Sequence, residues 1–229
     1  MQRAVIDLPC NLGPKVSDWA INVLGRSAGD GVTGSGQVVY GAQPRWEATL
    51  TLSGFGRDRV LAWEAVRAKL KGRVNVLRVT ICDPYRATMA EIGVPPGDAG
   101  ETPHEDETLF DDGTGYDYEP TFRATETYER GAEELVFDPT SIGNALQPGQ
   151  WFSHDDWPYK VTGIWQEDGG LARIAFEPPL RREIPEGADI TLRATGLFAF
   201  ESDLEGRLPR QLGKSGDATV NLVEWISRP

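Results

Sequence analysis

The pattern of apolar and polar positions is clearest between Pro44 and Asp83, where it predicts a strand, a helix and a second strand. The first strand shows apolar side chains at every second position, namely Trp46, Ala48, Leu50 and Leu52. Alternation with a period of two is typical of a half-buried strand. The second strand has its apolar residues at Val74, Val76, Leu77 and Val79. Asp83 followed by Pro84 ends this second strand, because proline cannot donate to a ladder.

Between the two strands we expect a helix from Asp58 to Lys71, with Asp58 as its N-terminal cap. Its apolar face consists of Leu61, Trp63, Val66 and Leu70. We expect this face to be buried on a sheet. Gly72 suits the left-handed conformation that ends many helices, and the cations near this end are favoured by the helix dipole. The basic end is a candidate contact for an acidic neighbour.

Short strands recur between residues 133 and 205, separated by turn residues such as Pro148-Gly149 and Asp168-Gly169-Gly170. The candidates are ELVFD, GQWF, YKVTGIW, LARIAF, ADITLRA and LFAFE. This spacing predicts a small antiparallel barrel, of the oligonucleotide/oligosaccharide-binding (OB) shape, or a sandwich. Residues 84–132 precede it as an acidic, irregular linker: Asp98 to Glu119 holds nine acidic residues and no Lys or Arg.

The closing segment, residues 218–226, reads ATVNLVEWI and predicts a long strand that needs a sheet to join. The strand–helix–strand unit is its natural host. We therefore expect one domain from residues 1–83 and 206–229, with residues 133–205 inserted into it. Termini that lie close together make such insertions tolerable.

The glycine-rich stretch GRSAGDGVTGSGQ matches the dinucleotide-binding fingerprint literally at Gly29, Gly31 and Gly34. That fingerprint requires a helix after its third glycine, whereas strand-like residues follow here. A hairpin or arm that is ordered only when something packs on it is the better interpretation. Gly213-Lys214-Ser215 is not a phosphate loop, because Leu208 stands where such a loop requires glycine.

The composition changes the picture in two respects. A formal charge of −12 argues against binding of a phosphate backbone over most of the surface. The sequence contains no apolar run of 18 residues, and its N-terminus lacks the apolar core of a signal peptide. We therefore expect no membrane insertion.

The cysteines and histidines are too few for a zinc site. Cys10 and Cys82 are the only cysteines, and His104 and His154 the only histidines. Two reduced thiols are favoured, but a Cys10–Cys82 disulfide stays open because both residues end predicted strands.

No residue is assigned a catalytic or cofactor-binding role. The acidic run is best interpreted as a solvated loop rather than as a carboxylate pair for glycoside hydrolysis. The EF-hand pattern counted from Asp111 fails, since Gly113 and Phe122 occupy ligand positions, although another kind of calcium site stays open. His154, with Ser153 before it, is expected in a hairpin turn rather than in a triad.

Aromatic residues give the remaining candidates. Trp151, Trp157, Trp165 and Tyr159 would suit a platform for sugars or single-stranded nucleic acid, but a core or interface role is favoured. For the other unit we assign packing or interface roles to one set of residues: Trp19, Trp46, Leu61, Trp63, Val66, Leu70 and Trp225.

Several motifs occur in order along the chain. In the first unit they are Arg45-Trp46-Glu47, Leu70-Lys71-Gly72 and Asp83-Pro84. In the second unit a longer segment runs from PGQWF, at residues 148–152, to ADITL, and VNLVEWI closes the chain. In this order the motifs resemble the distal tail proteins of long-tailed phages and of phage-like gene transfer agents, and VNLVEWI is similar to the terminal strand of that group. The resemblance spans most of the chain.

The resemblance implies a mainly β protein with one flanking α-helix. It implies a tail-tube-like β-sandwich domain and an inserted small β-barrel or sandwich. Proteins of this group form a hexameric ring at the tail tip of the virion, after assembly in the host cytoplasm. The ring joins the tail tube protein to the baseplate hub protein, and DNA passes transiently through its lumen. The inserted domain can support tail fibres or receptor-binding proteins, and no reaction is catalysed.

Two other functions compete with this structural role. A carbohydrate- or receptor-binding module built on the second unit predicts an exposed aromatic groove near Trp151 or Trp165. A tail-associated hydrolase predicts two carboxylates converging from rigid strands.

Overall fold

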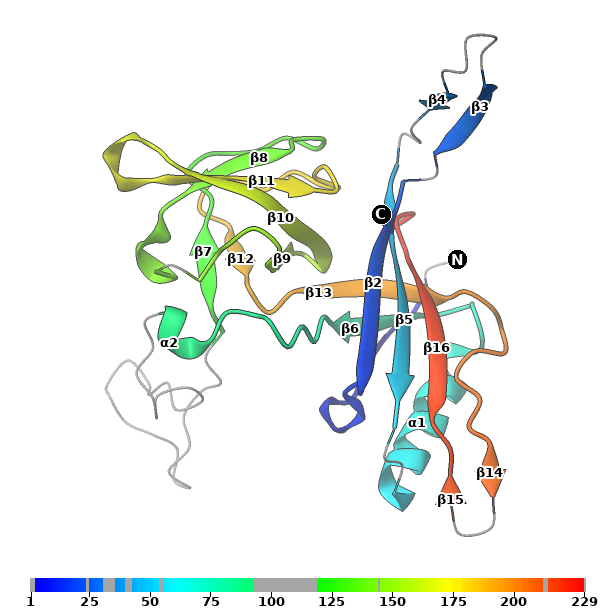
Figure 1. Cartoon of the computed structure of the whole chain (residues 1–229). Helices are drawn as coiled ribbons and strands as arrows, with labels where there is room; N and C mark the ends of the chain where they lie inside the picture. The colour runs from blue at the N-terminus through cyan, green and yellow to red at the C-terminus, as the bar shows by residue number, and fades with distance from the viewer. Residues whose placement is uncertain are drawn as a thin grey trace, which may run out of the picture. The chain divides into compact units, whose positions relative to one another are not determined.

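The structure is a computed structural model, and it describes residues 3–23, 25–30, 36–39, 43–53, 56–92, 119–143, 145–211 and 214–228. The protein is mainly β (Figure 1), with two six-stranded sheets and one long helix in the described residues. The chain divides into two compact units, Met1–Cys82 with Gly196–Pro229 and Asp83–Thr195. The second unit is thus inserted into the first.

The first unit is built on a mixed sheet with the order β1-β6-β13-β16-β5-β2. Its strands are β1 (Val5–Asp7), β2 (Val16–Asn22), β5 (Arg45–Leu52), β6 (Val76–Thr80), β13 (Thr195–Phe200) and β16 (Ala218–Glu224). Strand β16 is antiparallel to β5 from Ala218 opposite Leu52 to Val223 opposite Glu47. This pairing confirms that the closing strand joins the sheet of the first unit.

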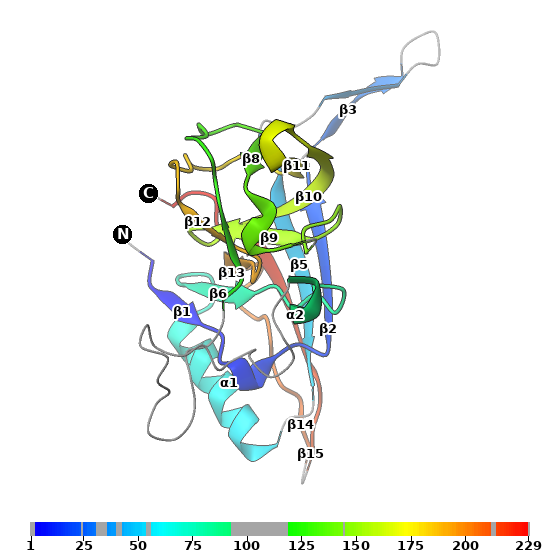
Figure 2. The ribbon, with the colours of Figure 1, turned by 90° about the vertical axis from the view of Figure 1, so that its left-hand side faces the viewer.

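The sheet changes direction at the junction of β13 and β16. Figures 1 and 2 show β6 and β13 running across the direction of β2, β5 and β16. The register between β13 and β16 covers only residues 198–200 and 222–224. Trp19 packs edge-on against Phe198, with ring centroids 5.2 Å apart, so side chains of the two parts of the sheet meet.

Helix α1 (Arg57–Leu70) begins one residue earlier than predicted, and its cap differs. The N-cap is Gly56, and no side chain caps it. Asp58 is therefore not the cap that we predicted: it lies within the first turn, where its charge acts only on the helix dipole. The other end is as predicted, because Gly72 is left-handed with φ 65°, as is Lys71 before it.

The buried face of α1 consists of Trp63, Val66 and Leu70. Leu61, assigned to this face from the sequence, is 57% exposed, so this assignment is wrong for the isolated chain. Residues in a helix are separated by about 100°, so Leu61 lies about 200° around the helix from Trp63. Trp63, Val66 and Leu70 follow spacings of three and four and share one side.

The segment after β13 holds α1 in place. The indole nitrogen of Trp63 donates to the carbonyl of Gly206 at 2.7 Å, and Arg67 donates to the carbonyl of Glu205 at 3.1 Å. The indole also faces Phe200, at a centroid distance of 6.4 Å. Residues 196–205 therefore belong to the first unit, and the prediction that LFAFE is a strand of the inserted domain is wrong.

Two β-ribbons extend the first unit. One consists of β3 (Arg26–Asp30) and β4 (Gly36–Val39), and the other of β14 (Arg210–Gln211) and β15 (Lys214–Ser215). Figure 1 shows them beyond opposite ends of β2, β5 and β16. Gly29 lies in β3, which confirms a hairpin at the glycine-rich stretch, while residues 31–35 lie outside the described residues.

The second unit is built on a sheet with the order β7-β12-β9-β10-β11-β8. Its strands are β7 (Thr121–Arg123), β8 (Glu134–Phe137), β9 (Trp151–His154), β10 (Trp157–Gln166), β11 (Ala172–Glu177) and β12 (Asp189–Thr191). The short helices are α2 (Met89–Ile92), η2 (Pro139–Ser141) and η3 (Asp168–Gly170), besides η1 (Cys10–Leu12) in the first unit.

The edge strands β7 and β8 of this sheet meet. Ala124 forms an antiparallel bridge with Phe137, and the amide of Thr125 donates to the carbonyl of Val136 at 3.2 Å. Strand β7 was not predicted, and residues 119–132 belong to this unit rather than to the predicted linker. The remaining acidic stretch, residues 93–118, lies outside the described residues.

The interior of the second unit is aromatic. Five rings stack or meet edge-on with centroids 4.7 to 6.0 Å apart: Phe122, Phe137, Phe152, Tyr159 and Phe176. Such pairs add to the free energy of burial. The β9–β10 hairpin closes through Asp155 and Asp156, both with positive φ, as a two-residue turn with the strands' own twist requires.

Candidate functional site

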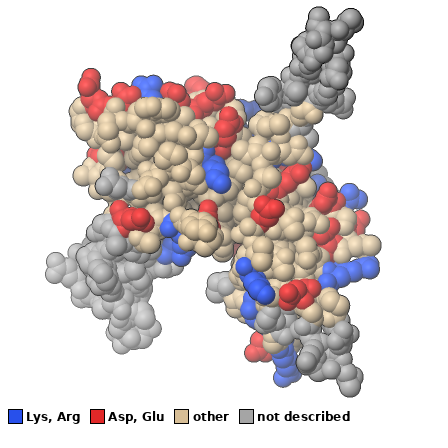
Figure 3. Space-filling model, viewed as in Figure 1, with Lys and Arg blue, Asp and Glu red and all other residues tan. Residues whose placement is uncertain are grey.

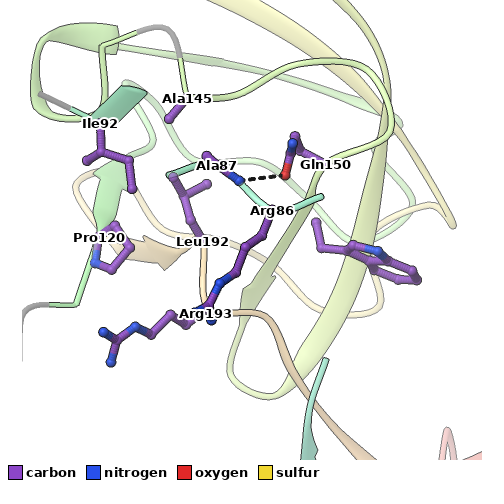
Figure 4. Close-up of a pocket in the computed structure, with 9 residues that line it drawn as sticks. Arg86, Ala87, Ile92, Pro120, Ala145, Gln150, Leu192 and Arg193 are labelled. Atoms are coloured by element: carbon purple, nitrogen blue, oxygen red, sulfur yellow. Dashed lines mark hydrogen bonds between the residues drawn. The ribbon is translucent and has the colours of Figure 1, made fainter. Parts of the chain in front are cut away.

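A small pocket in the second unit is lined by residues that include Ala87 and Gln150, which are joined by a hydrogen bond (Figure 4). Gln150 accepts from the amide of Ala87 at 3.2 Å and donates to the carbonyl of Tyr85 at 2.8 Å. The pocket has a volume of about 20 Å³. One water needs roughly 10–15 Å³, so this pocket has room for little more than a water. Its contacts fix the segment that enters the second unit.

A larger groove lies at one end of the sheet in the second unit, with a volume of about 690 Å³. Small-ligand sites have volumes of about 300–1,000 Å³. The groove is lined by Phe137, Pro139, Thr140, Gly143, Leu146, Gln147, Ile164, Trp165, Gln166, Gly170 and Ala172. These residues come from the end of β8 and the loop after it, and from the β10–β11 hairpin. None of them carries a charge.

Trp165 is the exposed aromatic residue of this groove. Its side chain is 51% exposed and lies back along β10 over Gly163. A Cβ atom at residue 163 would come within 2.6 Å of the indole ring. The glycine thus makes the space in which the ring lies. The sequence signal was present as a glycine two positions before a tryptophan, but we did not interpret it.

The other aromatic candidates of this unit are core residues, as the favoured interpretation had it. Trp151, Trp157 and Tyr159 are all buried. The ammonium of Lys160 lies over Trp151, 4.9 Å from the ring centroid. The hydroxyl of Tyr159 accepts from the amide of Arg181 at 3.0 Å. Of the four aromatic residues considered for a sugar or nucleic-acid platform, Trp165 is therefore the one with an exposed ring.

In the first unit, the packing candidates fall into two groups. Trp46, Trp63, Val66 and Leu70 are buried, whereas Trp19 and Trp225 are partly exposed and Leu61 is exposed. Arg3 lies over the ring of Trp225, with its guanidinium carbon 5.6 Å from the centroid. Trp19, Trp225 and Leu61 are thus the members of the set with surface left for a partner.

The outer face of β2, β5 and β16 carries polar side chains among small and apolar ones. A shallow depression of about 180 Å³ is lined there by Asp18, Glu47, Glu201 and their neighbours. Arg45, a cation on this face, lies 3.1 Å from a carboxylate oxygen of Glu47. On the face of the molecule drawn in Figure 3, acidic and basic side chains are interspersed. A surface of this kind offers no basic track to a phosphate backbone.

His154 and Ser153 hold the sheet together. His154 lies at the end of β9, with Nδ1 3.1 Å from the carbonyl oxygen of Asp189. The hydroxyl oxygen of Ser153 is buried and accepts from the amide of Thr195 at 3.0 Å. Asp156 accepts from the hydroxyl of Thr195 at 2.8 Å. Each group is thus placed by a structural hydrogen bond. A hairpin turn is present as predicted, but it consists of Asp155 and Asp156, and His154 is the last residue of β9 before it.

One titratable group with a shifted pKa, Asp138, adjoins the groove, because it accepts hydrogen bonds from the lining residue Thr140. Burial, followed by the charge of Glu133, raises the pKa of Glu177. Hydrogen bonds from Thr140 lower the pKa of Asp138. No group of three acidic, histidine or cysteine side chains in the described residues is placed to hold a metal ion. Cys82 is exposed and free, so it forms no disulfide with Cys10.

A comparison with models of known protein families finds no match, and neither does a comparison with curated proteins. Within the described residues, every helix is too short or too polar to cross a membrane.

Proposed function

We propose that this chain is a structural protein of a phage-like particle, which forms a hexameric ring at the distal end of the tail. The ring joins the tail tube to the baseplate hub and leaves a lumen through which DNA passes. In this proposal the first unit is the tail-tube-like ring domain, and the inserted unit is an OB-like barrel that faces attached fibres or receptor-binding proteins. The motifs around Arg45, Leu70 and Asp83 support it by their resemblance.

The pair of β-ribbons is the observation that carries the proposal. Each ribbon, β3–β4 and β14–β15, forms a sheet of only two strands within the described part of the chain. An isolated two-stranded hairpin is at best marginally stable in water. Ribbons beyond both ends of a sheet therefore point to stabilisation by neighbouring subunits.

The two faces of the first unit also suit a ring wall. Helix α1 buries Trp63, Val66 and Leu70, whereas the outer face of β2, β5 and β16 exposes Asp18 and Thr49. We assign this outer face to the lumen. An uncharged to acidic wall would let DNA slide, because strong phosphate contacts would hold it back.

The inserted unit supports the OB-like part of the proposal through its closure. The bridge between Ala124 and Phe137 joins the edge strands, as a small barrel requires. Closure removes exposed strand edges and leaves a compact body that suits attachment of another protein.

Negative-stain imaging of the purified protein and of particles that contain it tests the proposal. We expect annular particles with a central hole, and the same rings at tail tips. Isolated single copies, together with absence of the chain from particles, would contradict it. A lumen lined mainly by Lys and Arg would contradict the assignment of the sheet face.

A further inference from the structure

We propose that the groove beside Trp165 binds an uncharged saccharide, with the indole of Trp165 as the stacking platform. All residues that line the groove belong to the second unit, and the inference does not rest on the proposed ring. It concerns the second unit by itself.

The first argument is the placement of Trp165. A side chain of this size that is 51% exposed at the wall of a groove leaves a ring surface in water. Gly163 lets the ring lie down along β10, so the ring is supported rather than free to swing. A flat, supported aromatic surface is what the apolar C–H face of a sugar ring packs on, with gains like those of other aromatic contacts.

The second argument is the absence of charge from the lining. All eleven residues that line the groove are uncharged, in a protein in which 25% of residues are charged. An anionic ligand would find no cation among these residues, and the carboxylate of Asp138 beside the lining is already engaged by the amide and hydroxyl of Thr140. An uncharged ligand avoids the desolvation of a charge, which is expensive without a partner.

The third argument is the kind of polar group that the lining offers. Gln147 and Gln166 each present an exposed side-chain amide, which combines two donors with an acceptor. Thr140 adds a hydroxyl that donates to Asp138 and keeps its acceptor capacity. Sugar hydroxyls both donate and accept, so amides and hydroxyls around an aromatic platform match their chemistry. The volume of about 690 Å³ suits a short oligosaccharide rather than a long chain.

The test is titration of the full chain with chitotriose, cellotriose and maltotriose, followed by calorimetry and by saturation-transfer NMR. We expect at least one of these trisaccharides to bind with a Kd below about 1 mM. Trp165→Ala should weaken that binding about tenfold or more, because the stacking surface is lost. Tyr85→Ala is the matched control: Tyr85 is 86% exposed in the same unit, lies outside the groove, and should leave the Kd unchanged.

Gly163→Ala provides a second variant that keeps every lining residue. Its new methyl group must displace the Trp165 ring, so we expect the Kd to rise while the circular dichroism spectrum stays that of the parent. Several results would overturn the proposal. These are a Kd above about 1 mM for all three trisaccharides, unchanged binding by Trp165→Ala, or preference for sialyllactose or a proline-rich peptide.

Discussion

Gly206 contacts Trp63 of helix α1 closely. Its φ is 65°, its carbonyl accepts the indole N–H of Trp63, and an added Cβ would lie 2.4 Å from the Trp63 ring. We expect Gly206→Ala to lower the free energy of unfolding of the first unit by about 2–4 kcal/mol, through backbone strain and overpacking together. Urea unfolding measures this change.

Gly187→Ala separates the two effects of the Gly206 change. Gly187 has a φ of 74°, but an added Cβ would meet nothing within 4 Å. Only the strain of the left-handed backbone should contribute there, and it should lower the free energy of unfolding of the second unit by about 1 kcal/mol. Equal losses for the two variants would show that the contact with Trp63 is unimportant.

The pKa of Asp203 gives a prediction on pH. The side-chain hydrogen bond from Arg73, then its backbone amide, hold this pKa below the ordinary value of 3.8. A carboxyl whose pKa is depressed by folding stabilises the protein above its unfolded pKa. That contribution is lost as the pH falls through the folded pKa. We expect Arg73→Gln to raise the pKa of Asp203 toward 3.8, as measured by NMR titration of the carboxyl group.

Arg57→Gln is the control for that titration. It removes the same charge at the opposite end of α1, where Arg57 lies far from Asp203. The pKa of Asp203 should stay depressed in this variant. A similar rise in both variants would mean that net charge, rather than the Arg73 hydrogen bonds, sets the pKa.

At the scale of elements, α1 offers a matched pair of leucines. Leu70 is 1% exposed and Leu61 is 57% exposed on the same helix. We expect Leu70→Ala to reduce the free energy of unfolding by about 2–5 kcal/mol, because a buried side chain leaves a cavity. Leu61→Ala should change it by less than about 0.5 kcal/mol. Urea unfolding at low protein concentration compares them, and equal losses would place Leu61 in the core.

The sequence predicted the elements whose pattern repeats over several turns or strand positions. The alternation in β5 and the spacings in α1 are long enough to define a face, and β16 was apolar enough to require a sheet partner. The assignment of Leu61 to the buried face was wrong because it rested on the apolar character of the residue alone. The angle of Leu61 around the helix differs by about 200° from that of Trp63.

Short strands were harder to assign. Strand β13 is a run of apolar residues, and such a run does not say which of two sheets it joins; the contacts of Phe198 and Phe200 with the first unit decide this. Strand β7 has three residues, too few for a period. Trp165 could not be told from the buried Trp151 and Trp157 by residue type alone, because only the groove shows which ring stays exposed.

At the scale of the whole molecule, we expect the β-ribbons to be needed for assembly of the ring but not for folding of the chain. We expect replacement of residues 26–39 by a short Gly-Ser linker to abolish rings and leave a folded chain, since β3 and β4 pair only with each other in the described residues. Size-exclusion chromatography measures the assembly and circular dichroism the fold. Shortening the Asp168–Gly170 turn of the second unit is the control, and it should leave the rings intact.

The central claim is that the protein forms a ring of six copies, and its native mass tests this claim most directly. Native mass spectrometry across a concentration series should reveal a species of six times the 25.1 kDa chain mass, and the variant that lacks residues 26–39 should lose it. A mass of 25.1 kDa at every concentration for the unmodified chain would contradict the claim.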